Sequence, residues 1–490
     1  MKEISVIYIE RILQVSVGFF ITYMVVNYFD PSDYGVYKYV VSLGSMFLIL
    51  VLLGFNFANI RYIPEYLLRK EFGKIFFQVG LFAIIQCVLI VVVMAVVYTL
   101  HKNEIIGFDK RISIIMLSVL CLLYYIKSYF CESLYVALSK RLRLTYFRIL
   151  LYFIQFAIVY FAIKVNFVDI KEFLIYIVAF SGVEVLVLSF GLLLILRRIL
   201  PGLSVESFSL KEHFSYATNN YGFSWTNFLR DNAATIVLVS YLFEFTEVAY
   251  YSVALIIPNI VRSFSPSKIF SGFLMPEYVK SYARDDDKSV VFDGLNFMGK
   301  LNLLFLIPAL IYSFLMFHPV IEALFGVEYA KNSIYLGAFL FLNILALSYL
   351  DLNLLLANII KRSDLVLKIN MLSVSNVVII IFLHEMGNIS IGIANLSSTI
   401  LTVFVFWLTV GKIYSDRINF HLFSKEIVSY IVAISIFSLI VFNLSVKLYA
   451  VVFILVSPVI AILVIKSKFF NIDERESIKK MFPSKIKGIV

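Results

Sequence analysis

Apolar runs of roughly 20 residues, separated by short polar segments, recur along the whole chain. A helix of about 20 residues crosses about 30 Å of hydrocarbon, so each run predicts a transmembrane helix. The pattern predicts about fourteen such spans. They lie near residues 9–28, 37–56, 76–99, 112–137, 146–163, 173–196, 215–242, 247–275, 294–316, 333–357, 366–383, 389–411, 426–444 and 448–465.

Composition agrees with an all-α integral membrane protein. Hydrophobic residues make up 61% of the 490 positions and charged residues only 15%, which is more apolar material than a soluble core buries. The net charge of +10 is divided among short clusters between the apolar runs, so nucleic-acid binding is not expected. The three cysteines and five histidines show no metal-ligand spacing, and no metal site is expected.

Lysine and arginine alternate between the two sides of the predicted membrane. Segments on the side of the N-terminus carry roughly four times as many as the opposite segments, which predicts that both termini are cytoplasmic. The N-terminus lacks a small-residue cleavage site, so we expect the first span to stay attached. The opposite segments are short and hold no domain.

The chain contains an internal repeat. "FDPSDYGVYKY" after the first span matches "FEFTEVAYYSV" after the seventh, "PEY" recurs at 64–66 and 276–278, and "ALSKR" at 137–141 matches "ANIIKR" at 357–362. Three matches in order predict two homologous six-helix lobes. Because six is even, the repeat is parallel, around a central cavity, and the last two spans are an added pair. We expect lobes at 1–200 and 201–415, with a helix hairpin and basic cytoplasmic tail at 416–490.

Each "PEY" copy is interpreted as a helix stop at the cytoplasmic interface. Proline ends the helix there, and tyrosine lies at headgroup depth beside basic residues.

The repeat motifs resemble a known family. "FDPSDYGVYKY", "LGFNFANIRYIPEY" (53–66) and "FGVEYAKNSIYLGAFLF" (325–341) are similar to signatures of the polysaccharide transporter branch of the multidrug, oligosaccharidyl-lipid, polysaccharide (MOP) exporter superfamily. Ala249 departs from the pattern, where the family usually has glycine. The resemblance implies a flippase for a polyprenyl-diphosphate-linked oligosaccharide, such as an O-antigen or capsule unit, in a bacterial inner membrane. It also implies work beside a glycan polymerase and its chain-length machinery.

Polar residues inside spans are candidate functional residues, because they are costly in lipid. In the seventh span four polar positions share one helical face: Asn220, Ser224, Asn227 and Asp231. Arg230 lies on a stripe beside them. The pattern favours a cavity lining, and a polar seam between helices is the alternative.

The eighth span places Arg262 between Pro258 and Pro266, with Lys268 beyond the second proline. A bent cationic helix suits a diphosphate, because guanidinium matches phosphate oxygens. An ion pair between Arg262 and Asp351 or Asp231 is the alternative. Lys127, five residues before Glu132, is a further candidate for substrate contact.

Three acidic residues are candidates for coupling to a proton or sodium gradient: Asp231, Asp351 and Glu184. Each is alternatively a counter-ion for a buried cation. Four charged residues near span ends are expected to be interfacial anchors: Glu10, Arg11, Lys38 and Lys300.

The sequence therefore favours a transporter rather than an enzyme, with no cofactor. An ion-coupled multidrug exporter of the same superfamily is the first alternative. A membrane glycan polymerase is less favoured, because the chain has no large external loop for catalytic residues.

Overall fold

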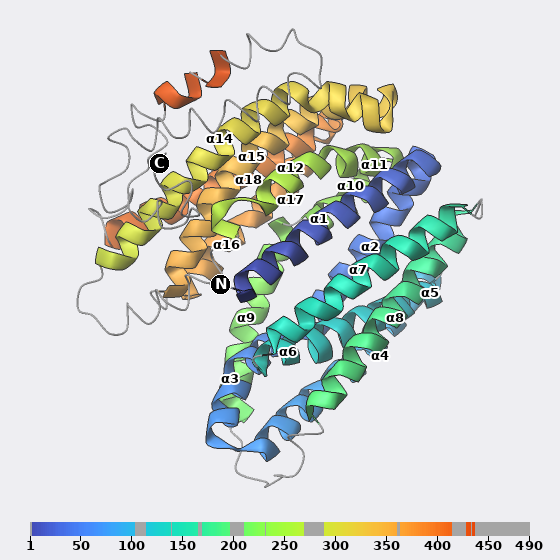
Figure 1. Cartoon of the computed structure of the whole chain (residues 1–490), viewed down its shortest axis with the longest axis vertical. Coiled ribbons are helices and arrows are strands. Elements are labelled where there is room, and N and C mark those ends of the chain that lie inside the picture. The colour runs from blue at the N-terminus through green and yellow to red at the C-terminus, as the bar shows by residue number, and fades with distance from the viewer. Residues whose placement is uncertain are drawn as a thin grey trace. The chain divides into compact units, whose positions relative to one another are not determined.

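The computed structural model shows an all-helical protein (Figure 1). It describes residues 2–102, 114–138, 140–164, 169–196, 210–230, 232–268, 289–359, 363–413, 428–432 and 434–436. These residues contain no β-strand. Their contacts divide the chain into two compact units, Met1–Ser252 and Val253–Val490.

The described residues of the first unit are almost entirely helical. It contains α1 (Lys2–Tyr28), α2 (Pro31–Leu52), α3 (Phe55–Arg69), α4 (Phe72–Lys102), α5 (Ile114–Tyr125), the π-helix η1 (Ile126–Glu132), α6 (Ser133–Ala137), α7 (Arg141–Lys164), α8 (Ile170–Leu196), α9 (Leu210–Arg230), α10 (Asn232–Leu242) and most of α11 (Phe245–Ala254). Helix α1 packs along α7, α2 packs against α5 and α10, and α8 packs against α5 and α7.

The second unit is built around two long helices. It contains α12 (Ile256–Ser263), α14 (Ser289–Phe325), α15 (Val327–Ile359), α16 (Ser363–Asn370), η3 (Met371–Ser373), α17 (Val374–Phe382), η4 (His384–Met386) and α18 (Ile389–Ile413). Helix α15 lies between α14 and α18 and contacts both. The units are defined by packing, whereas the predicted boundary near residue 200 comes from the sequence repeat and stays a prediction.

Within the described residues, nine helices are long and apolar enough to cross a bilayer. They coincide with the first six predicted spans and with those predicted at 294–316, 333–357 and 389–411. Shorter apolar helices cover 232–242 and 367–382. The last two predicted spans lie largely outside the described residues, so the total of fourteen stays a prediction.

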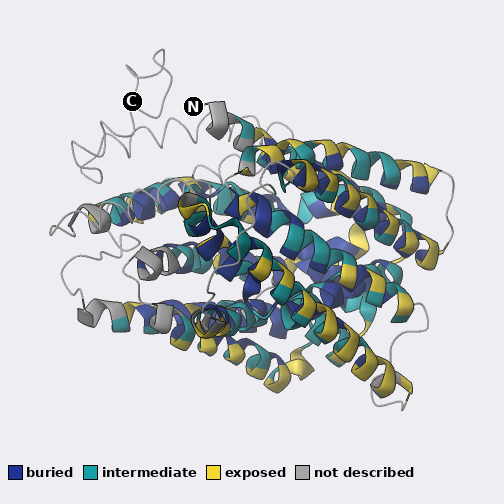
Figure 2. Ribbon diagram, turned by 90° about the horizontal axis from the view of Figure 1, so that it is seen from below, coloured by how far each residue is buried: buried dark blue, intermediate teal, exposed yellow. Residues whose placement is uncertain are grey.

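Large apolar side chains face outward on these helices. Val91, Leu186 and Phe190 are each more than half exposed, and exposed residues recur along the helix faces in Figure 2. Exposed apolar surface of this extent is unfavourable in water and favourable in lipid. The protein is therefore a multi-pass membrane protein.

The interpretation of Pro64 as a helix stop is wrong. Pro64 lies inside α3, which continues to Arg69. The chain breaks earlier, at Leu53 and Gly54, where φ is 48° and 77°. Helix α3 tolerates the proline because its buried face, which includes Ala58, Tyr62 and Tyr66, packs against α4, α6 and α9. The second "PEY", at 276–278, lies outside the described residues.

The expected loop between the ninth and tenth spans is helical instead. Helix α14 runs to Phe325 and α15 begins at Val327, so Gly326 alone joins them. Its φ of 92° is strained for residues with a side chain, which explains why glycine stands at this turn.

Both copies of the repeated motif adopt the same local geometry. Phe29 and Asp30 form the two-residue link between α1 and α2, and Phe243 and Glu244 form that between α10 and α11. In each copy the phenylalanine N–H donates to a valine carbonyl four residues earlier, at 3.0 Å in the first and 2.8 Å in the second. The duplicated sequence therefore encodes a duplicated helix-turn-helix corner.

Candidate functional site

The polar face of α9 is only partly described. The Asn220 amide donates to the Tyr216 carbonyl at 2.8 Å, and the Ser224 hydroxyl donates to the Asn220 carbonyl at 2.9 Å. Both side chains are half-buried, and these bonds stay within α9. Asp231 and the side chains of Asn227 and Arg230 lie outside the described residues. The predicted roles of this face stay predictions.

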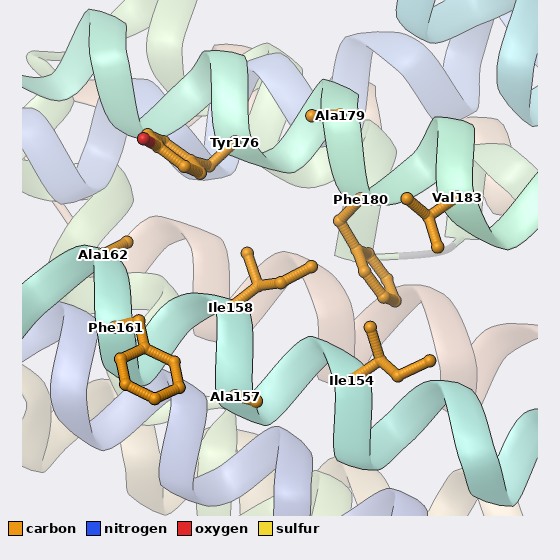
Figure 3. A pocket seen from close by; sticks show the side chains of 9 residues that line it. All are labelled: Ile154, Ala157, Ile158, Phe161, Ala162, Tyr176, Ala179, Phe180 and Val183. Atoms are coloured by element: carbon orange, nitrogen blue, oxygen red, sulfur yellow. The ribbon is translucent and has the colours of Figure 1, made fainter.

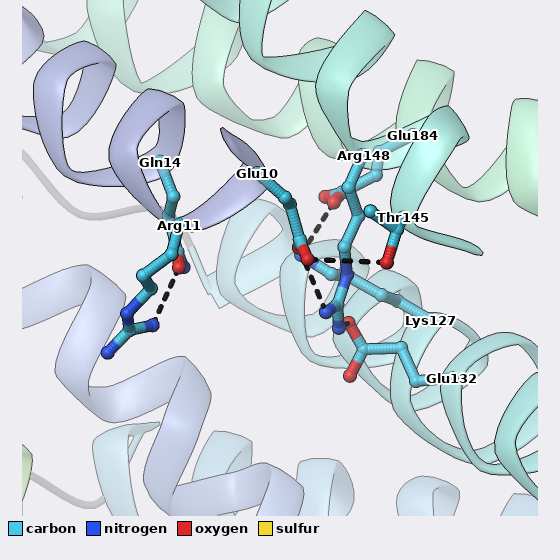
Figure 4. Close-up of polar contacts among 8 residues, drawn as sticks. All are labelled: Glu10, Arg11, Gln14, Lys127, Glu132, Thr145, Arg148 and Glu184. Carbon is cyan, nitrogen blue, oxygen red and sulfur yellow. Dashed lines mark hydrogen bonds and ion pairs between the residues drawn. The ribbon is translucent and has the colours of Figure 1, made fainter. Parts of the chain in front are cut away.

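A cluster of five charged side chains gathers inside the first unit (Figure 4). The Lys127 Nζ lies 2.7 Å from Glu184 Oε1, and the Arg148 Nη2 lies 2.7 Å from Glu132 Oε1. Arg148 also reaches Glu10, at 3.4 Å. We call Glu10, Lys127, Glu132, Arg148 and Glu184 the N-terminal charge cluster.

Glu10 is the member that the sequence did not indicate. It was expected at the membrane surface, but it is only 9% exposed and accepts a hydrogen bond from the Thr145 hydroxyl at 3.3 Å. Arg148, which contacts Glu10 and Glu132, is a second member that the sequence did not single out. The spacing of polar residues on α1 gives no sign of this contact, because its partners lie on α7.

The π-helix explains how Lys127 and Glu132 belong to one cluster. In an α-helix, residues five apart differ by about 140° around the axis. The i→i+5 bonding of a π-helix brings such residues closer to one face, and π-helical turns are frequent at functional sites. Both residues lie in η1, which packs against α8.

A second cluster forms in the second unit, and we call Arg262, Lys268 and Asp351 the C-terminal charge cluster. The Arg262 Nη2 lies 3.3 Å and 3.4 Å from the two carboxylate oxygens of Asp351. The Lys268 Nζ lies 3.1 Å from Asp351 Oδ1. The ion pair between Arg262 and Asp351, which was the alternative to substrate contact, is therefore present.

Breaks in the eighth predicted span allow this convergence. Pro258 has no N–H to donate to the Ala254 carbonyl, and α11 ends at Ala254 before α12 begins. A second break follows at Phe264, ahead of Pro266. In an unbroken α-helix Arg262 and Lys268 would point about 120° apart.

Asn302 of α14 holds the second break. Its side-chain Oδ1 accepts the backbone N–H of Ser267 at 2.8 Å, and Asn302 is buried. The Ser265 and Ser267 hydroxyls lie 3.4 Å apart beside it. Sequence reasoning missed Asn302, and its signal was only that of an uncharged polar residue in a span.

Three other predicted anchors occupy different environments. Arg11 donates to Gln14 at 2.7 Å, and the Lys38 Nζ lies 5.3 Å from the centre of the Tyr34 ring. Lys300 is only 7% exposed. None of these side chains belongs to either charge cluster as defined here.

Tyr66 of the first "PEY" has a role inside the protein. Its hydroxyl lies 2.8 Å from the Nε2 of His213 on α9, and the ring of Tyr62 lies 4.0 Å from the same imidazole. All three residues are buried, so the motif fastens α3 to α9 rather than placing tyrosine among lipid headgroups.

An apolar groove of about 590 Å³ lies between α7 and α8 (Figure 3). Its lining includes Ile154, Phe161 and Phe180, and Tyr176 contributes the one hydroxyl. A groove of this composition suits hydrocarbon and offers no charged partner for a headgroup. The described residues contain no group of three or more potential metal ligands.

Solved structures of transporters have a similar fold. The lipid II flippase MurJ in an inward closed conformation matches with a TM-score of 0.67 and 14% identity, over 96% of this chain and 98% of that one. An inward-facing multidrug resistance MATE family transporter of the MOP superfamily matches at 0.61 and 12%, over 82% and 96%. A mutant of the Vibrio cholerae MATE transporter VcmN matches at 0.50 and 11%, over 84% and 96%.

No protein family and no curated protein sequence matches the chain. The chain is thus similar to the MurJ and MATE transporters in fold, through the solved structures and not through sequence.

Proposed function

We propose that this protein is a flippase that moves polyprenyl-diphosphate-linked oligosaccharide units from the cytoplasmic to the outer leaflet of a bacterial inner membrane. The observation that carries the proposal is the convergence of Arg262 and Lys268 beside a broken helix. Two cationic side chains at one point suit a phosphate, whose oxygens accept several hydrogen bonds at once. The fold shared with a lipid II flippase supports it.

The rest of the assignment follows from the substrate. The sugar-diphosphate head would be bound by the protein while the polyprenyl tail stays in lipid. No covalent step is needed, so the protein would act without a cofactor, driven by a proton or sodium gradient. It would deliver the translocated units to a glycan polymerase. Both termini would lie in the cytoplasm, as the distribution of lysine and arginine predicts.

The test measures which leaflet holds the lipid-linked oligosaccharide. The gene is deleted in its host, and a membrane-impermeant label is applied to intact and inverted vesicles. We expect complete units to accumulate in the cytoplasmic leaflet, wild type to restore export, and Arg262→Ala to fail. Arg61→Ala is the control, because that side chain is 56% exposed and pairs with Glu65 within its own helix. A normal distribution of the glycan in the deletion strain would contradict the proposal.

The N-terminal charge cluster favours a second candidate function, an ion-coupled multidrug exporter. Its three carboxylates, from Glu10, Glu132 and Glu184, face two cations. An excess of negative charge suits a cationic drug or a coupling cation. Resistance profiles of the deletion strain separate the two functions, since a drug exporter predicts sensitivity to cationic compounds while glycan export stays normal.

A further inference from the structure

The contact between Arg262 and Asp351 is longer than a strong charge-assisted hydrogen bond, which measures about 2.7–2.9 Å. Only the Nη2 of Arg262 takes part, at 3.3 Å and 3.4 Å from the two oxygens. In the N-terminal charge cluster, the Lys127–Glu184 and Arg148–Glu132 pairs reach 2.7 Å, and the Arg148–Glu10 pair is long as well, at 3.4 Å. A strong arginine–carboxylate pair uses two nitrogens in parallel, and this pair does not.

The Nε of Arg262 leaves room for an additional acceptor. Its Nε is buried and has no hydrogen-bond acceptor among the described residues. The Nδ2 of Asn302 is also buried without an acceptor among the described residues. The Oδ1 of the same side chain accepts the Ser267 N–H at the neighbouring helix break. A buried donor without a partner is costly, so an anion with more oxygens than a carboxylate would be favoured here.

We propose that Asp351 is a resident competitor for the substrate's phosphate at Arg262 and Lys268. This inference rests on the proposed function and assigns Asp351 a role other than ion coupling. The carboxylate engages both cations before substrate arrives, at 3.3 Å and 3.1 Å. A phosphate that takes the Nε and Nη2 edge of Arg262 displaces it.

Competition of this kind has a defined consequence for transport. When only a fraction of the protein has the cations available, the apparent Kd rises by the inverse of that fraction. Asp351 therefore weakens binding, and it speeds release because it recaptures the cations as the phosphate leaves. A flippase needs such release on the far side, so the same residue lowers affinity and raises turnover.

The test compares binding and transport by the full chain in lipid nanodiscs and vesicles. The binding probe is farnesyl diphosphate, and transport is measured with the labelled lipid-linked oligosaccharide. We expect Asp351→Asn to lower the Kd about tenfold, or about 1.4 kcal/mol, and to lower both KM and turnover. Asp351→Ser provides a second neutral variant, in case either one fails to fold.

Two control variants identify the cause. Asp293→Asn removes an exposed carboxylate of α14 and should leave the Kd unchanged. Arg262→Lys keeps the charge opposite Asp351 but removes the planar fork, so it should weaken binding of the probe.

The outcomes separate the inference from the proposed function. If wild type binds the probe and Arg262→Lys weakens it, but neither neutral variant tightens it, Asp351 is not a competitor although the phosphate site stands. A lower melting temperature with unchanged Kd would make it a structural partner, and loss of gradient dependence with unchanged Kd would make it a coupling residue. If wild type does not bind the probe, the phosphate site and the inference fall together.

Discussion

The Lys127–Glu184 pair allows a test of how burial decides the worth of an ion pair. Its atoms lie 2.7 Å apart, and the side chains are 31% and 11% exposed. The Arg61–Glu65 pair has the same 2.7 Å separation, with exposures of 56% and 38%. Distance is therefore matched and burial is not. A double-mutant cycle on each pair isolates the effect of burial.

The structure predicts unequal single variants. Removing one partner of a fully buried pair costs about 3–5 kcal/mol. Lys127→Met leaves the more buried Glu184 charged without its partner, so we expect a loss of about 2 kcal/mol after allowance for partial exposure. Glu184→Gln leaves a lysine that can reach toward water, and we expect about 1 kcal/mol. The double variant should lie within about 1 kcal/mol of wild type.

The measurement is the free energy of unfolding in mixed micelles. For the exposed control pair, Arg61→Met, Glu65→Gln and their double variant should show a coupling of at most about 0.5 kcal/mol. If the losses of Lys127→Met and Glu184→Gln simply add in the double variant, the pair is not coupled and the reasoning is refuted. Transport by the double variant then decides whether Lys127 contacts the substrate. If it does, transport stays lost in the double variant even though stability returns.

Three further predictions concern local geometry. Gly35→Ala would place a Cβ against the backbone carbonyl of Phe245, so we expect a lower melting temperature and a free energy of unfolding lower by about 1–3 kcal/mol. Gly18→Ala is the control and should be nearly neutral, because its Cβ would meet open space. Asn302→Leu removes the acceptor of the buried Ser267 N–H at the helix break, which should lower the free energy of unfolding by about 1–3 kcal/mol and weaken binding of farnesyl diphosphate. Asn302→Asp keeps an acceptor oxygen and should retain most of the stability. Deletion of Ser128 should convert the π-helix to an α-helix and abolish transport. Hydrogen–deuterium exchange of residues 126–132 measures the first effect, and the transport assay measures the second.

Much of the fold could be predicted from the sequence because a membrane imposes simple constraints. In the part of the chain that the structure describes, apolar runs long enough to cross hydrocarbon coincide with nine candidate spans. The repeated corner after the first and seventh spans also has the expected regularity, with the same two-residue link in both copies.

The failures have one physical origin, which is that proline and hydropathy are local signals. Pro64 predicts a helix end, but packing of α3 against three other helices outweighs one missing hydrogen bond. The segment around Gly326 is polar enough to resemble a loop, yet it forms the ends of two long helices. Tertiary contacts decided both cases.

The candidate site was predictable in its residue types and not in its pairings. Arg262, Asp351, Lys127 and Glu184 were each indicated because charge inside lipid is costly, and the described structure places all four in ion pairs. Their positions within the predicted spans group Asp351 with Glu184 as candidate coupling residues. Their contacts differ, because Glu184 meets one lysine at 2.7 Å while Asp351 meets two cations at longer range.

That difference in pairing is what gives the two acidic residues different expected functions. A short, one-to-one pair is hard to displace, so Glu184 can respond to substrate only if Lys127 moves with it. A carboxylate shared between two cations through longer contacts can yield one of them without losing all of its stabilisation. Geometry of this kind depends on a helix broken at prolines and held by Asn302, and residue spacing alone contains no record of it. The assignment of Asp351 as a competitor, and of Glu184 as a structural or coupling partner, therefore follows from where the chain breaks rather than from how deep each residue lies.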